Sequence, residues 1–162
     1  MLRGIEIVTG SVGPFIDEVI LDYGNRHRRR LVLCGSAGTE FLLDLANVAD
    51  LREGDGIILS SGEMVRVRAA EEPLMEVRCA NAAQLARISW HVGNRHLAAE
   101  IGDGVLRLRE DHVIAAMIEG LGGAVRHLVA PFNPEGGAYG ARALAPSHDA
   151  ANQVHSNGHD HG

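Results

Sequence analysis

The pattern of apolar residues changes at Glu71-Glu72-Pro73, and this change limits the fold more than any other feature of the chain. The residues before it form apolar runs too short for helices, separated by turn signals such as Gly35-Ser36-Ala37-Gly38 and Ser61-Gly62. Several short strands at this spacing are typical of a small β-barrel or sandwich. Strands are predicted at residues 17–23, 30–34, 41–45, 56–60 and 64–68.

The residues after this boundary alternate between strand and helix patterns. Asn81 is a suitable N-cap for a helix over 82–92 that ends in a left-handed Gly93-Asn94 stop. Asp111 caps a second helix, which Gly122-Gly123 ends. The order β-α-β-β-α-β is that of a ferredoxin-like domain, and the predicted fold class is therefore α+β. Its strands are expected at 74–79, 97–101, 105–109 and 124–130.

From Asn133 onward, Pro, Gly, Ala, Ser and His dominate without periodicity, which predicts a disordered tail. The sequence therefore predicts three parts. A β-rich domain occupies residues 1–72, a ferredoxin-like domain occupies 73–142, and a histidine-containing tail occupies 143–162.

Composition and charge argue against several classes of function. A net charge of -6 differs from the basic footprint of a nucleic-acid binder. Cys34 and Cys79 form no CxxC pair, so we expect no cysteine-based zinc site and interpret both as small buried apolar residues. There is no signal-peptide pattern and no uncharged apolar run of about 18 residues, so we expect a cytoplasmic protein without membrane contact.

Signals for catalysis are missing, so we expect a protein that is not an enzyme. The GxSxG, Walker A and HExxH motifs do not occur. The only strong basic block is Arg26-His-Arg-Arg-Arg30. We interpret it either as a solvated strand edge or as a surface that docks an acidic protein.

Two histidines flank the predicted helix stop, in the element His91-Val-Gly-Asn-Arg-His96. Neutral imidazole is the commonest protein ligand for nickel, copper and zinc. Positions five apart on a helix differ by about 140° in direction, so the two share no helix face. We interpret His91 as packed beside Trp90 and His96 as pointing outward. Either His96 hydrogen-bonds at the helix end, or two copies of it face one ion across a two-fold dimer axis.

The C-terminal segment is rich in histidine, with His148, His155, His159 and His161. This composition is typical of metal binding. A flexible tail loses conformational entropy on binding, so we expect weak binding and fast exchange, as suits a carrier. Glu110-Asp111-His112 is a third candidate site, although capping and the helix dipole also explain acidic residues in a first helical turn.

Together these motifs resemble the UreE family of urease accessory proteins, the nickel metallochaperones of urease maturation. The resemblance extends over nearly the whole chain. It rests most on His91-Val-Gly-Asn-Arg-His96, followed by Pro131-Phe-Asn-Pro-Glu-Gly-Gly-Ala-Tyr139 and the histidine tail. Supporting matches are Arg26–Arg30, Gly54-Asp55, Val65–Glu71 and Asp111-His112-Val113.

The resemblance implies an N-terminal domain that binds protein or peptide, and a ferredoxin-like domain that binds metal and forms a homodimer. It implies that His96 binds Ni²⁺ at the dimer interface. His112 matches a position sometimes used at a peripheral metal site, although Glu110 stands here in place of a second histidine. The implied partners are the urease accessory GTPase and the apo-urease complex. We expect tail histidines to close over the ion: His155, His159 and His161.

Two alternatives to nickel delivery remain at this point. Imidazole sites also bind Zn²⁺, and they bind Cu²⁺ more tightly than Ni²⁺, so the residues do not select the metal. A zinc or copper buffer or sensor would have the same ligands. A protein-docking adaptor would use the N-terminal domain and the basic block instead.

Overall fold

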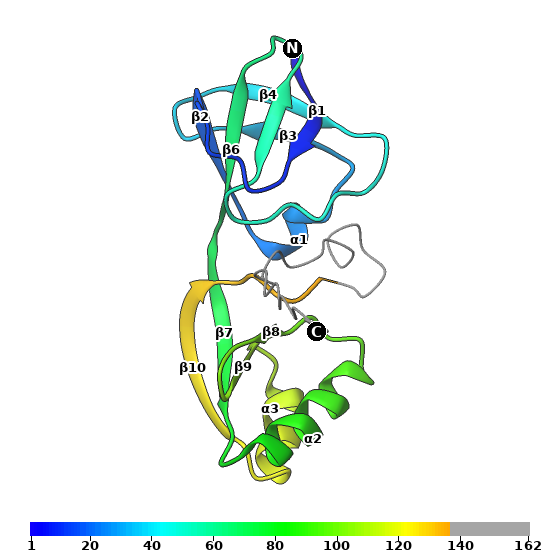
Figure 1. The fold of residues 1–162 in the computed structure, drawn as a ribbon, viewed down its shortest axis with the longest axis vertical. Coiled ribbons are helices and arrows are strands. Elements are labelled where there is room, and N and C mark those ends of the chain that lie inside the picture. The colour runs from blue at the N-terminus through cyan, green and yellow to red at the C-terminus, as the bar shows by residue number, and fades with distance from the viewer. Residues whose placement is uncertain (137–162) are drawn as a thin grey trace, which may run out of the picture.

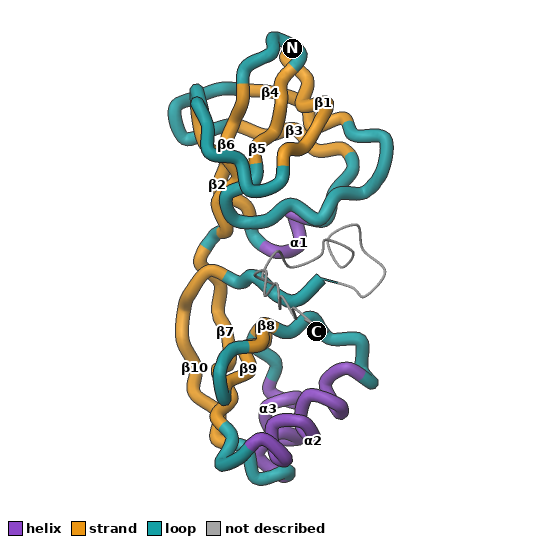
Figure 2. Tube along the Cα trace, viewed as in Figure 1, coloured by secondary structure: helices purple, strands orange, loops and turns teal. Residues whose placement is uncertain are grey.

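The computed structural model describes residues 1–136, which form an elongated molecule with one β-sheet at each end (Figure 1). Strands dominate the N-terminal half, and the two longer helices lie beside the C-terminal sheet (Figure 2). No helix within residues 1–136 is long and apolar enough to cross a membrane. The elements in chain order are β1 (Leu2–Val8), β2 (Asp17–Leu21), α1 (Tyr23–Arg26), β3 (Arg30–Cys34), β4 (Glu40–Asp44), β5 (Gly56–Leu59), β6 (Met64–Ala69), β7 (Glu71–Arg78), α2 (Ala82–Gly93), β8 (Glu100–Ile101), β9 (Val105–Arg109), α3 (His112–Gly120) and β10 (Ala124–Pro131).

The N-terminal sheet has six strands in the order β2-β6-β5-β1-β4-β3 and forms a nearly closed barrel. This confirms the predicted barrel-like fold. The turn after β3 brings the two edge strands together, because the N–H of Ser36 donates to the carbonyl of Glu18 at 2.8 Å. The buried carboxylate of Asp17 accepts the N–H groups of Ala37 at 2.8 Å and Thr39 at 2.9 Å in the same turn. The core contains Val19, Leu21, Leu33, Phe41, Leu43, Leu51, Ile57, Leu59, Val65 and Val67.

The sequence does not predict strand β1, although β1 lies inside the sheet between β5 and β4. Gly4 interrupts its apolar pattern. A Cβ at Gly4 would lie 2.7 Å from Cγ2 of Ile57, so this strand crosses the core where only glycine fits. The close contact with Ile57 leaves no room for an apolar side chain at position 4. The strand therefore lacks the alternating apolar pattern that would have predicted it.

The C-terminal sheet has the antiparallel order β10-β7-β9-β8, and α2 and α3 pack against one face of it. This is the ferredoxin-like arrangement that the sequence predicts. Both predicted N-caps are confirmed, since Asn81 accepts the N–H of Gln84 at 2.9 Å and Asp111 accepts the N–H of Val113 at 2.8 Å. The core between sheet and helices contains Met75, Val77, Ile88, Val92, Leu106, Leu108, Ile114 and Ile118.

Two expectations about the N-terminal half need correction. Cys34 is exposed and only Cys79 is partly buried, so the pair are not both buried apolar residues. Burial raises the pKa of the Cys79 thiol. Arg26 is 1% exposed, so the basic block is not uniformly a solvated edge. Arg28, Arg29 and Arg30 are its exposed part.

Candidate metal site

The chain leaves α2 through a turn in which His96 takes a left-handed backbone conformation, with φ 55°. The N–H of His96 donates to the carbonyl of Gly93 at 2.9 Å, and the N–H of Leu97 donates to that of Val92 at 3.4 Å. These two bonds form a Schellman motif, whose left-handed position is usually a glycine. Among residues 1–136, His96 is the only residue other than glycine with a positive φ. Backbone strain of this kind is concentrated at functional sites.

The predicted left-handed stop at Gly93-Asn94 is wrong. Gly93 is the last residue of α2, and Asn94 keeps a right-handed conformation with φ -62° and ψ -18°. The N–H of Asn94 donates to the carbonyl of Trp90 at 3.0 Å, which continues the helical pattern. The left-handed position therefore falls on His96, and the strand expected over 97–101 is reduced to β8, which contains only Glu100 and Ile101.

The His96 imidazole is exposed and forms no hydrogen bond or ion pair with another residue in the described part of the chain. Its backbone N–H, rather than its ring, bonds at the helix end. The His91 ring is half-buried and packs edge-on against Trp90, with ring centroids 5.0 Å apart. The two histidines therefore have different surroundings, as the sequence suggests, and the imidazole of His96 is the more exposed of the two.

Exposed apolar side chains precede and follow the turn that holds His96 in the chain. Trp90 is 64% exposed, Ile101 is 52% exposed and Leu97 is 36% exposed. Between α2 and β8 lies an apolar pocket of about 190 Å³, lined in part by Val92, Leu97 and Ile101. Exposed apolar side chains gathered around one site are typical of a surface that a partner covers.

The third candidate site, Glu110-Asp111-His112, is not assembled around a common centre. Glu110 pairs with Nδ1 of His127 at 2.9 Å. Asp111 caps α3, and its Oδ1 accepts the N–H of Ile114 at 3.0 Å. His112 is exposed at the first residue of α3. Both acidic side chains thus have structural partners, which leaves only His112 for a peripheral ligand.

A complete metal site is not present within residues 1–136, because no three His, Cys, Asp or Glu side chains there are close enough to hold one ion. Borderline metals take four to six ligands. The exposed imidazole of His96 fits such a metal in chemistry but supplies one ligand. The remaining ligands would come from a second copy or from outside the described residues, where the predicted ligands His155, His159 and His161 lie.

Sequence reasoning missed the residues that hold this turn against the sheet, chiefly Glu100, Arg107 and Asn133. Arg107 donates to Glu100 at 3.3 Å, and the N–H of Asn133 donates to the other oxygen of Glu100 at 3.0 Å. The alternation of charged residues along β7 and β9 was the available signal. It indicates a polar sheet face, but it does not indicate which charges meet.

Two protein-family models match the chain. The model described as "UreE urease accessory protein, N-terminal domain" matches residues 12–70, and the model of its C-terminal domain matches residues 72–162. Both descriptions are of an accessory protein, which confirms the expectation that the chain is not an enzyme.

Curated proteins named urease accessory protein UreE are similar over most of the chain. One from Bradyrhizobium sp. BTAi1 is 50% identical over 133 residues, which are 82% of this chain and 65% of that protein. One from Chelativorans sp. BNC1 is 45% identical over 154 residues, which are 95% of each chain. One from Paracoccus denitrificans is 48% identical over 135 residues, which are 83% of this chain and 84% of that protein.

For four of the relatives, from Bradyrhizobium and Rhodopseudomonas, the match covers 61% to 65% of their own length. This chain therefore spans less than two thirds of those proteins. The two family models nevertheless match nearly the whole of this chain, in the order of the two sheets. The chain belongs to the UreE family of urease accessory proteins.

Proposed function

We propose that the chain is a metallochaperone that binds Ni²⁺ and delivers it for assembly of the urease active site. The observation that supports this most is the imidazole of His96, which is exposed, unpartnered within the described residues and held at a strained turn among exposed apolar side chains. Membership in a family of urease accessory proteins supports the link to urease maturation.

In this proposal the ion lies between the two His96 side chains of a homodimer. The apolar surface around His96 supports an interface there, since a two-fold axis places the same patch opposite itself. His155, His159 and His161 complete the coordination, and His112 serves as a peripheral ligand. The cargo is Ni²⁺, and the same imidazoles accept Zn²⁺ or Cu²⁺.

The proposal extends to the division of the chain and to its partners. Residues 1–72 form a domain that binds protein or peptide, residues 73–142 form the metal-binding and dimerisation domain, and residues 143–162 form a histidine-containing tail. The partners are the urease accessory GTPase and the apo-urease complex, in the cytoplasm. Release of the ion follows when a partner offers better ligands or displaces the tail.

The test is a calorimetric titration of nickel into the wild type, His96→Ala and a chain truncated after Ser147, with the mass of each measured in solution. His127→Ala is the matched control, because His127 is also an exposed histidine of this half but pairs with Glu110. We expect His96→Ala to remove the tightest site at about one ion per dimer. Truncation should weaken that site, and His127→Ala should leave it unchanged.

The same titration at several pH values tests imidazole ligation. Only neutral imidazole binds metal, so the affinity should fall as the pH drops below about 6.5. Binding that is unchanged in His96→Ala but lost with the tail would contradict the interfacial site. Unchanged affinity down to pH 5 would contradict histidine ligands altogether.

A further inference from the structure

A row of four charged side chains crosses the whole C-terminal sheet on the face that the helices leave open. Arg126 on β10 lies opposite Glu76 on β7, Glu76 lies opposite Arg107 on β9, and Arg107 lies opposite Glu100 on β8. The charges alternate in sign along this row. Each neighbouring pair is bonded, at 3.0 Å, 3.0 Å and 3.3 Å respectively.

The centre of the row is fixed firmly. The Glu76 side chain is 3% exposed and bonds to three arginines, with Arg78 the third at 3.1 Å. The hydrogen bond from Arg107 is the main reason that the pKa of Glu76 is lowered. Arg107 donates to Glu76 through both Nε, at 3.1 Å, and Nη2, at 3.0 Å. Both donors reach the same oxygen, Oε2, and together they restrict the rotation of the guanidinium.

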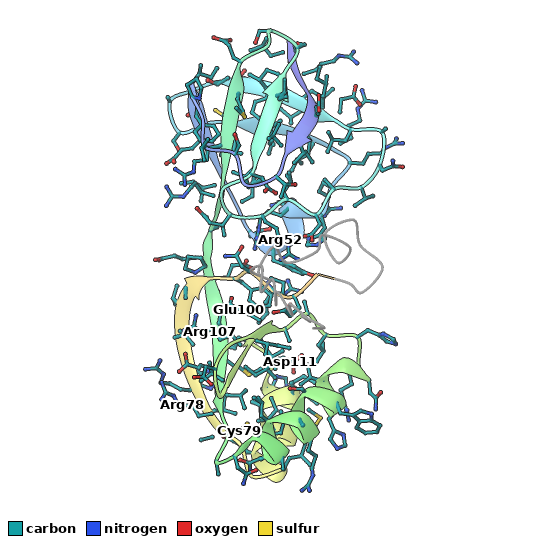
Figure 3. The ribbon with its side chains drawn as sticks, in the orientation of Figure 1. Arg52, Arg78, Cys79, Glu100, Arg107 and Asp111 are labelled. Atoms are coloured by element: carbon teal, nitrogen blue, oxygen red, sulfur yellow. The ribbon has the colours of Figure 1, made fainter. Side chains whose placement is uncertain are left out.

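Glu100 is the last member of the row, and it connects the sheet to the turn that holds His96. Its Oε1 accepts from Arg107 at 3.3 Å, and Figure 3 labels these two side chains. Its Oε2 accepts the N–H of Asn133 at 3.0 Å. The preceding carbonyl, that of Ala99, accepts the N–H of Glu135 at 2.8 Å. Strand β8 is only two residues long and forms a short ladder with β9. These side-chain and backbone bonds therefore add to the contacts that hold this end of the loop.

Only three residues separate Glu100 from His96, and the other end of this short loop is tied to α2 by the N–H of Leu97. The His96 ring has no partner of its own within residues 1–136, so the direction of its imidazole depends on its backbone. That backbone is in a strained conformation, which persists only when its surroundings hold it. Anchors at both ends of the loop supply this support.

We propose that Glu100 is a positioning residue for His96: through Arg107 and Asn133 it fixes the loop that aims the imidazole at the metal ion. This inference rests on the proposed role of His96 as a nickel ligand. Groups that orient a metal ligand commonly change metal affinity about 10-fold to 100-fold when they are removed.

The test compares nickel affinity in the wild type, Glu100→Ala and Glu100→Gln, with Glu18→Ala as the matched control. Glu18 is a partly exposed glutamate that also pairs with an arginine, Arg68, at 3.3 Å, but it lies in the barrel. We expect Glu100→Ala to bind nickel at least about 10-fold more weakly, with Glu18→Ala unchanged. Glu100→Gln should recover most of the affinity, because its amide oxygen still accepts the N–H of Asn133.

Two further measurements separate positioning from a general loss of structure. In a His96→Ala background, which lacks the tightest site, Glu100→Ala should leave the remaining nickel binding unchanged, because it acts through His96. Amide hydrogen exchange of residues 97–100 should be faster in Glu100→Ala and not in Glu18→Ala, with or without metal.

The possible failures are distinguishable. If the wild type binds nickel without using His96, the proposed function is wrong and this inference falls with it. If His96 is required but Glu100→Ala binds as the wild type does, only the inference is wrong. An equal loss in the presence and absence of His96 would likewise overturn it, because Glu100 would then act elsewhere.

Discussion

The guanidinium of Arg26 donates a hydrogen bond to the side-chain oxygen of Asn133, at 3.0 Å and across 107 residues of sequence. A second bond from Arg26 reaches the carbonyl of Phe132. Phe132 is fully buried and packs edge-on against Tyr23, with ring centroids 5.3 Å apart. Helix α1 of the barrel is thereby joined to the end of β10 and to the segment that binds Glu100.

Arg26→Ala should therefore destabilise the protein strongly. It leaves the buried carbonyl oxygen of Phe132 and the partly buried side-chain oxygen of Asn133 without their donor, and a buried group left in this way costs about 1–3 kcal/mol. We expect a loss of about 3 kcal/mol in the free energy of unfolding, measured by urea denaturation. Arg28→Ala, in the exposed part of the same basic block, should change it by less than about 0.5 kcal/mol. Equal effects of the two substitutions would mean that Arg26 does not hold α1 against the end of β10.

Asp17 should make the stability of the barrel depend on pH. Burial by itself would raise the pKa of its carboxyl, but hydrogen bonds from the N–H groups of Ala37, Thr39 and Glu18 outweigh burial and lower it from 3.8 to about 2. A carboxyl with a lowered folded-state pKa stabilises the fold above the unfolded pKa, and the effect is lost as the pH falls through the folded one.

Asp17→Asn should accordingly lower the free energy of unfolding by about 2 kcal/mol at pH 7. The difference from the wild type should shrink between about pH 4 and pH 2, where the wild-type carboxyl becomes protonated. Urea denaturation across this range is the measurement, and Glu40→Gln, at an exposed glutamate of β4, is the control. A difference that stays constant with pH would show that the charge of Asp17 is not what closes the barrel.

His96→Gly should increase stability while removing the proposed ligand. Glycine takes a left-handed conformation without the cost of about 1 kcal/mol or more that a Cβ imposes, so we expect a gain of up to about 1 kcal/mol. Thermal or urea denaturation measures it, in parallel with nickel titration. Asn94→Gly, two residues earlier and right-handed, should lower stability instead. A loss of stability in His96→Gly would contradict the strained turn.

Glu76→Gln should destabilise the C-terminal sheet, because it removes the charge that three arginines share. Charge-assisted hydrogen bonds are worth about 1.5–3 kcal/mol each, and the arginines are exposed enough to regain water. We expect a net loss of about 2 kcal/mol in the free energy of unfolding. Glu18→Gln, at a partly exposed ion pair, should cost less than about 1 kcal/mol. An effect no larger than that of Glu18→Gln would mean that the row of charges across the C-terminal sheet contributes little to the free energy of unfolding.

The elements that could be predicted are those specified by local sequence. Strands β3 and β9 have the predicted bounds, and both long helices begin after the predicted caps, Asn81 and Asp111. Caps and alternating apolar residues act over three or four positions, so they are visible in the chain itself. Strand β1 was missed because Gly4 fits against Ile57, which is distant in sequence.

For the candidate site, too, local sequence predicts one part and contacts between distant residues decide the rest. The sequence by itself determined the α+β class, the ferredoxin-like order of elements and the outward position of His96 as against His91. Only the tertiary structure decided that His96 is left-handed, that Arg26 is buried against Asn133, and that Glu100 ends a row of charges across four strands. The physical reason is that hydrogen bonds and ion pairs between distant segments depend on where the fold places both partners, and no local pattern records that placement.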